Sequence, residues 1–148
     1  MGNMIKINID EVCSYVASVV KNVPGIAGAY LFGSALQGKV RPESDIDIGL
    51  VPEKDSLSER ETDFMESEVC NLLQQFRGHP FDVITLTMNS NNIIFCFRVI
   101  KEGRLIYARN IDRIQDFMEH VSRRYAEVYP RYKQALEEII EEVISPGN

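Results

Sequence analysis

The chain has 148 residues, the length of a single globular domain, and 45% of them are hydrophobic, which is enough for a buried core. Its formal net charge of −6 argues against the broad basic surface of proteins that mainly bind a nucleic-acid backbone. The longest apolar run, residues 93–97, is too short to span a bilayer, and the N-terminus lacks a signal-peptide pattern. We therefore expect a soluble, cytoplasmic, single-domain protein over residues 1–148 that binds neither membrane nor nucleic acid directly.

The first part of the chain predicts a helix, a strand and a loop. Asp10 is a suitable N-cap for a helix over residues 11–22, in which valines recur at helical spacing. Residues 26–32, with the sequence IAGAYLF, predict a buried strand. We expect residues 34–44 to form a short turn or helix and then a loop.

Residues 45–51, with the sequence DIDIGLV, alternate between polar and apolar side chains. This period of two is typical of a strand with one buried face. Ile46 and Ile48 are expected to pack against a core, so Asp45 and Asp47 share the opposite face.

The second half of the chain predicts more helix than strand. An amphipathic helix, a turn, a strand, a helix and a short extended piece precede a long helix with a break or kink at Pro130. These elements span residues 57–76, 78–80, 81–86, 90–101, 104–107 and 111–144, in that order. The order predicts an α+β fold of the α/β type, in which helices flank a small mixed sheet.

Two of these helices carry a stripe of apolar residues at helical spacing. We expect the stripe in the first of them to face the core. The stripe in the helix over 57–76 consists of Leu57, Phe64, Met65, Val69, Leu72, Leu73 and Phe76. The stripe in the long C-terminal helix consists of Phe117, Val121, Tyr125, Val128, Tyr129, Tyr132, Leu136 and Ile140. This second stripe either packs on the sheet or binds a partner, because a small domain need not cover so long a helix alone.

The two aspartates of the strand form a candidate metal site. Residues i and i+2 of a strand have Cα atoms about 6.5–7 Å apart and side chains on one face. The carboxylates of Asp45 and Asp47 can therefore converge on one or two divalent cations. Without a cation they repel each other, and one takes up a proton. Ligands that are all oxygen favour Mg²⁺ or Mn²⁺ over zinc.

Three further residues complete a candidate site for a nucleotide. Gly33 lets the backbone approach a phosphate closely, and the Ser34 hydroxyl with nearby N–H groups can bind phosphate oxygens at a helix start. Asp82 joins the two aspartates if its strand lies beside residues 45–51, and it could then hold a second metal and help deprotonate an attacking hydroxyl. Taken singly, each aspartate is better explained without a site, Asp45 as a cap or turn residue and Asp47 and Asp82 as solvated strand residues. The combination favours metal-dependent transfer of a nucleotide.

The segment LFGSALQGKVRPESDIDIGLV, residues 31–51, resembles the nucleotidyltransferase signature of the polymerase-beta-like superfamily. That signature reads Gly-Ser, ten residues, then Asp-x-Asp, and residues 81–86 resemble the family's third-carboxylate strand. The likeness covers a catalytic core over about 26–86, and a helical C-terminal part follows over about 110–145. Through its length, the segment FRVIKEGRLIY and this helical tail, the chain is similar to the minimal nucleotidyltransferases, and among them to MntA antitoxins paired with HEPN-domain HepT toxins.

The resemblance implies a role for each of these residues. Gly33 and Ser34 would bind the phosphates of ATP, Asp45 and Asp47 would coordinate two Mg²⁺, and Asp82 would join one metal and activate the acceptor. The acceptor oxygen would attack the α-phosphorus, and pyrophosphate would leave. In the MntA subfamily the acceptor is a tyrosine of the HEPN toxin encoded nearby, so we expect AMP transfer to that toxin and a hetero-oligomer with it.

One position departs from the family pattern. Members often carry a basic residue just before the second glycine of the loop, whereas Gln37 precedes Gly38 here. A phosphate-binding cation is missing at this point, and Lys39 or Arg41 could replace it. Five arginines later in the chain could also bind nucleotide or an acidic surface, and the sequence does not distinguish among Arg98, Arg104, Arg109, Arg123 and Arg124.

Two other functions stay open from the sequence. The first is nucleotide transfer to a small molecule, as in antibiotic nucleotidyltransferases, although 148 residues leave little room for a second domain to hold the acceptor. The second is an antitoxin that neutralises its toxin by physical masking, with weak or no catalysis.

Overall fold

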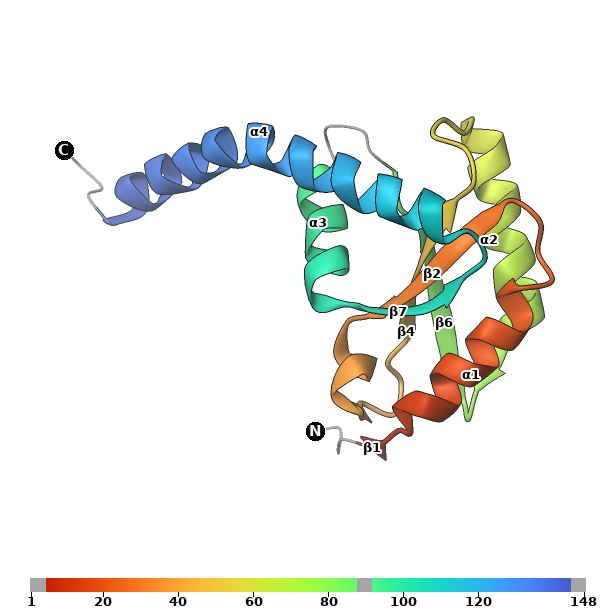
Figure 1. Ribbon diagram of the computed structural model, residues 1–148. Coiled ribbons are helices and arrows are strands. Elements are labelled where there is room, and N and C mark those ends of the chain that lie inside the picture. Colours follow the sequence, from red (N-terminus) through yellow and green to blue (C-terminus); the bar gives the residue numbers. More distant parts are fainter. Residues whose placement is uncertain (1–4, 88–91, 145–148) are drawn as a thin grey trace.

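The computed structural model describes residues 5–87 and 92–144 (Figure 1). The strands are β1 (Ile5–Lys6), β2 (Ile26–Phe32), β3 (Lys39–Val40), β4 (Ile46–Pro52), β5 (Gln75–Phe76), β6 (His79–Thr85) and β7 (Arg104–Ala108). The helices are α1 (Ile9–Val20), the short 3-10 helix η1 (Ser34–Gln37), α2 (Glu59–Leu73), α3 (Ile93–Glu102) and α4 (Ile111–Ile144).

The main sheet has five strands in the order β5-β6-β4-β2-β7. Strand β4 runs parallel to β6 and antiparallel to β2, and β7 lies antiparallel on the far side of β2. Strands β1 and β3 form a separate antiparallel pair. The predicted α+β fold with a small mixed sheet is therefore confirmed.

Helices cover both faces of the sheet, with α1 and α2 on one side and α3 and α4 on the other (Figure 1). The alternation predicted for β4 is confirmed, since Ile46, Ile48 and Leu50 are fully buried in the core beneath α1 and α2. Val51 belongs to the second core, beneath α3 and α4. The odd-numbered side chains of β4, Asp47 among them, consequently face the α3–α4 side of the sheet.

The prediction that Asp10 caps the first helix was wrong. Helix α1 begins at Ile9, and the side chain of Asn8 is the cap, accepting a 3.2 Å hydrogen bond from the N–H of Glu11. Asp10 lies in the first turn, where it pairs with Arg104. Asn and Asp are about equally good caps, so local preference does not decide between Asn8 and Asp10.

The helix predicted over 57–76 is shorter than expected, because Ser58 caps α2 and the helix ends at Leu73. Its inward stripe is also narrower, since Phe64 and Leu72 are 67% and 49% exposed. Phe76 lies beyond the helix in β5.

The turn predicted at 78–80 lies slightly earlier in the chain. Arg77 and Gly78 have φ angles of 51° and 84° and connect β5 to β6. His79 is buried in β6, with Nδ1 3.1 Å from the carbonyl oxygen of Ser44. Of the helix predicted over 90–101, residues 90 and 91 lie outside the described residues, and α3 begins at Ile93.

Helix α4 continues through Pro130, so the helix does not break there. Its axis changes direction near the middle, in keeping with the kink that was the other form of the prediction (Figure 1). Proline removes one backbone hydrogen bond, to the carbonyl of Ala126, and both residues are exposed, so water can bind that carbonyl. Ile114, Phe117 and Val121 are buried in the second core, whereas none of the described residues after Val121 in this helix is buried. The second half of α4 extends past the rest of the molecule (Figure 1).

Within residues 5–87 and 92–144, none of the helices combines the length and the apolar character that crossing a bilayer requires.

Candidate active site

Asp47 and Asp82 lie side by side on neighbouring strands. Parallel strands β4 and β6 pair in a register that sets Asp47 opposite Asp82, and β2 sets Phe32 opposite Asp47 on the other side. Adjacent strands lie about 4.8 Å apart, so both carboxylates leave the sheet close together on the same face. The condition set from the sequence, that the strand of Asp82 lies beside residues 45–51, is therefore met.

The charge of Asp47 is destabilised by its surroundings. The pKa of this carboxyl is raised from its ordinary value of 3.8 to about 6, mainly by burial and in smaller part by the nearby carboxylates of Asp82 and Asp45. Asp45 comes directly before β4, two residues ahead of Asp47, and so contributes to the same face. The repulsion expected for close carboxylates is thus present in the folded chain.

The three carboxylates suit a hard divalent cation by their chemistry. All donors are oxygen, and a divalent ion removes the repulsion that raises the pKa of Asp47. In the part of the chain that the structure describes, however, no three His, Cys, Asp or Glu side chains are already gathered closely enough to hold a metal. Asp82 is exposed, so its side chain has room to turn toward Asp47.

Gly33 joins the loop after β2 to this carboxylate site. Its φ is +80°, in the region that favours glycine, and a methyl group here would lie 2.2 Å from Oδ2 of Asp47. Ser34 follows at the start of η1 with an exposed side chain. The turn therefore sets its backbone and one hydroxyl directly against the metal-binding candidates.

The sequence of residues 15–112, more than half of the chain, matches the family described as Polymerase beta, Nucleotidyltransferase. The chain belongs to this nucleotidyltransferase family. The matched range contains the Gly-Ser turn and all three aspartates. No curated protein sequence matches the chain significantly.

Solved structures share the fold of this nucleotidyltransferase. One is a toxin–antitoxin structure with AMP-PNP, at 21% identity and a TM-score of 0.58 over 94% of this chain and 100% of that one. Another is the MntA–HepT toxin–antitoxin, at 18% identity and 0.53 over 93% and 97%. A third is a tri-AMPylated Shewanella oneidensis HEPN toxin in complex with MNT antitoxin, at 19% identity and 0.54 over 93% and 96%. The resemblance to polymerase-beta-like enzymes and MntA antitoxins is confirmed at the level of fold.

Neither of the two cations proposed for phosphate binding lines the cavity that adjoins Gly33. Lys39 is exposed in β3, where its backbone lies opposite Lys6 of β1 in the strand register. Arg41 lines a separate hollow of about 430 Å³ with Pro42, Glu43 and Ser44.

The cavity that adjoins Gly33, of about 570 Å³, contains residues that the sequence did not single out. It lies between the turn and α3 and is lined by Phe32, Gly33, Leu36, Gln37, Phe95, Arg98, Val99 and Glu102. Sequence reasoning missed Phe95 and could not separate Arg98 from the other arginines, because α3 is about 60 residues from the turn and only the fold brings them together.

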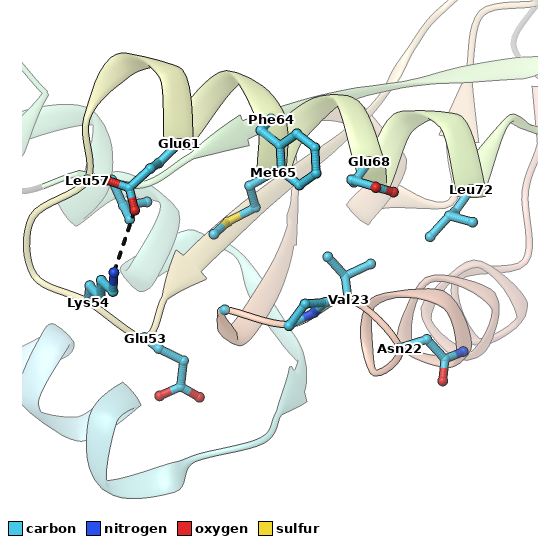
Figure 2. Close-up of a pocket in the computed structure, with 12 residues that line it drawn as sticks. Asn22, Val23, Glu53, Lys54, Leu57, Glu61, Phe64, Met65, Glu68 and Leu72 are labelled. Carbon is cyan, nitrogen blue, oxygen red and sulfur yellow. Dashed lines mark ion pairs between the residues drawn. The ribbon is translucent and has the colours of Figure 1, made fainter.

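A second cavity, of about 550 Å³, is drawn in Figure 2. It adjoins the start of β2 and the end of β4, the opposite end of these strands from Asp47. Phe64, Met65 and Leu72 of α2 face the loop around Val23 across it (Figure 2). Phe64 and Leu72, which the sequence assigned to the core stripe, therefore line a groove instead. No residue of the candidate active site borders it.

Replacing Gly33 by Ala is expected to lower nucleotide transfer at least tenfold, because the new methyl group must displace the Asp47 carboxylate. The left-handed backbone angle adds a loss of about 1 kcal/mol in the free energy of unfolding. The control is Gly78→Ala, since Gly78 has a φ of +84° but no atom within 4 Å of an added methyl group. Denaturation should show a loss of stability in both variants, larger for Gly33→Ala because of the added contact with Asp47, and transfer assays a loss only for Gly33→Ala. Equal activities would contradict the role of this contact.

Proposed function

We propose that this nucleotidyltransferase transfers AMP from ATP to a tyrosine hydroxyl of a partner HEPN toxin in the cytoplasm and releases pyrophosphate. The observation that carries the proposal is the Gly-Ser turn held against Asp47, with Asp82 opposite Asp47 in the sheet. Family membership supports the chemistry. The toxin as acceptor is supported by solved relatives described as toxin–antitoxin complexes, one with an AMPylated HEPN toxin.

Each residue of the candidate active site has its own role in the proposed reaction. Asp45, Asp47 and Asp82 would hold Mg²⁺, or Mn²⁺, which would neutralise phosphate charge and lower the pKa of the attacking hydroxyl. Gly33 and Ser34 bind and orient the phosphates. A bond forms from the tyrosine oxygen to the α-phosphorus, the bond from that phosphorus to the pyrophosphate oxygen breaks, and Asp82, the exposed carboxylate, accepts the tyrosine proton.

The toxin docks, in this proposal, on the distal stripe of α4, which we define as Tyr129, Tyr132, Leu136, Ile139, Ile140, Val143 and Ile144. These side chains are between 37% and 73% exposed. They recur every three or four residues, so they form one continuous apolar face on a helix that extends past the domain (Figure 1).

The charges beside the distal stripe favour a basic partner surface. Four exposed glutamates follow one another along the last turns, and none of them has an ion-pair partner among the described residues: Glu137, Glu138, Glu141 and Glu142. A matching surface is apolar at its centre and carries lysines or arginines at its rim.

The test is to incubate the purified protein with ATP, Mg²⁺ and the HEPN-type protein encoded next to it, and to weigh that partner by intact mass spectrometry. The expected result is a gain of one or more AMP units on a tyrosine located by fragmentation. The gain should vanish with EDTA and with Asp45→Asn.

An unchanged mass with an intact complex would favour the second candidate, neutralisation by masking alone. The long exposed stripe of α4 is the observation behind that candidate. In a toxicity assay, masking predicts that a double Asp45→Asn, Asp47→Asn variant still neutralises the toxin, whereas transfer predicts that it does not. If AMP instead appears on a small hydroxyl compound, the acceptor class is wrong.

A further inference from the structure

Arg98 is a cation beside the Gly-Ser turn, and its side chain has no role in the fold. It lies on the exposed side of α3 and lines the cavity that Gly33 also lines. Among the described residues it has no hydrogen-bond or ion-pair partner. A guanidinium with no structural contact, beside a phosphate-binding turn, is available for a ligand.

The other arginines that the sequence left open are engaged or remote. Arg104 pairs with Asp10, Arg109 donates to the Tyr107 hydroxyl and the Lys21 carbonyl, and Arg124 pairs with Glu127. Arg123 borders hollows along α4 that contain Asp116 and Glu119. Of the described side chains that line the cavity at Gly33, Arg98 alone carries a positive charge.

The site needs such a cation because it is otherwise acidic. Asp45 precedes β4 by one residue, Asp47 lies in β4, and Asp82 is opposite Asp47 in β6, so three carboxylates belong to this side of the site. Bound metal ions offset those carboxylates, and the triphosphate brings several further negative charges. The planar guanidinium donates two parallel hydrogen bonds to phosphate oxygens, which makes arginine well suited to this task.

The apolar part of the cavity suits the remainder of a nucleotide whose phosphates lie at the Gly-Ser turn. Phe32 and Phe95 contact each other edge to face, with ring centroids 5.5 Å apart, and with Val99 they give the cavity apolar walls. Phe32 is also the register partner of Asp47, so the apolar wall adjoins the carboxylates directly. A volume of about 570 Å³ lies within the range of small-molecule sites.

We propose that Arg98 binds the polyphosphate of the nucleotide in the cavity between the Gly-Ser turn and α3. The inference rests on the proposed function, because it takes ATP as the substrate. Glu102, one turn after Arg98 on the same helix, also borders the cavity and opposes the phosphates by its charge. The pair therefore sets how tightly the polyphosphate is held.

The test is to titrate ATP and AMP, each with Mg²⁺, into the wild type and variants by calorimetry. Arg98→Gln should weaken ATP binding at least tenfold but AMP binding less than about threefold, since a charge-assisted contact to the β- or γ-phosphate is lost. Arg98→Lys should recover part of the loss. Glu102→Gln should strengthen ATP binding about two- to threefold. The control is Arg60→Gln, an exposed arginine on α2 with no described partner, which removes the same charge.

The outcomes separate this inference from the proposed function. If the wild type binds no ATP, both fail. If the wild type binds ATP and Arg98→Gln binds it equally well, Arg98 has no such role and the proposed function stands. Equal losses of affinity for ATP and AMP would show that Arg98 contacts the base, the ribose or the α-phosphate. In the transfer assay, a raised KM for the toxin alone would show that Arg98 contacts the acceptor. Either result overturns the inference. Circular dichroism of each variant checks that the exposed substitution leaves the fold intact.

Discussion

Replacing Asp47 by Asn is expected to abolish AMP transfer and, in the same molecule, to make the fold more stable. Loss of one carboxylate from the proposed metal site removes several kcal/mol of charge stabilisation in the transition state, so the rate should fall about 10³-fold or more. The same carboxylate is half-buried, faces Asp82 and Asp45, and has its pKa raised to about 6. A neutral amide of the same shape removes that unfavourable charge.

The stability gain should depend on pH in a defined direction. Between pH 3.8 and about 6, folded Asp47 binds a proton more tightly than the unfolded chain does, so the wild type loses stability as pH rises through this window. Because this half-buried group keeps contact with water, which screens its charge, the raised pKa corresponds to a loss of about 1 kcal/mol in the free energy of unfolding at high pH. Asp47→Asn should therefore match the wild type at pH 3.5 and exceed it by about 1 kcal/mol at pH 8.

Denaturant unfolding in EDTA at both pH values measures this difference. Asp63→Asn is the control, since Asp63 is an exposed aspartate on α2 without a described partner, and it should change stability little at either pH. Adding Mg²⁺ should stabilise the wild type but not Asp47→Asn, because only the intact site binds the ion. A variant that loses activity but is less stable than the wild type at pH 8 would show that Asp47 serves the fold.

The local pattern around the turn was predictable because it depends on neighbours in sequence. The spacing of Gly33, Asp45 and Asp47, and the alternation along β4, are properties of a strand, a turn and a strand that follow one another. The position of Asp82 could only be stated as a condition, because its meeting with Asp47 depends on the parallel pairing of β4 with β6, which no local signal encodes. The register then follows from the buried residues on the opposite face of each strand.

The errors have the same origin in tertiary contacts. Asn8 and Asp10 are equally suitable caps, and the sequence alone does not favour either. Periodicity correctly identified the apolar positions of α2, but it could not show that Phe64 and Leu72 face a groove rather than the core. Arg98 lines the same cavity as Gly33 only because α3 packs against β2, and no local signal in the sequence encodes that contact.

Replacing Leu136 by Glu is expected to weaken the complex with the toxin at least tenfold, and adding Ile140→Glu should leave no detectable complex. Both side chains belong to the distal stripe and are 41% and 54% exposed, so a charge here costs the free protein little. In the complex, the same charge would be buried without a partner. The matched control is Gln134→Glu, which adds the same charge about 200° around the helix from Leu136 and so on the opposite face. It should change the affinity for the toxin less than about threefold.

Calorimetry with the toxin gives the affinities, and ATP binding checks that the catalytic domain is intact. A complex that survives both substitutions would show that the toxin docks elsewhere, and the groove of Figure 2 would then be the next surface to test. The stripe variants and Asp47→Asn also separate the two candidate mechanisms when used together. If AMP transfer neutralises the toxin, Asp47→Asn keeps the complex but fails to protect cells. If masking suffices, only the stripe variants fail to protect cells, because they alone remove the contact with the toxin.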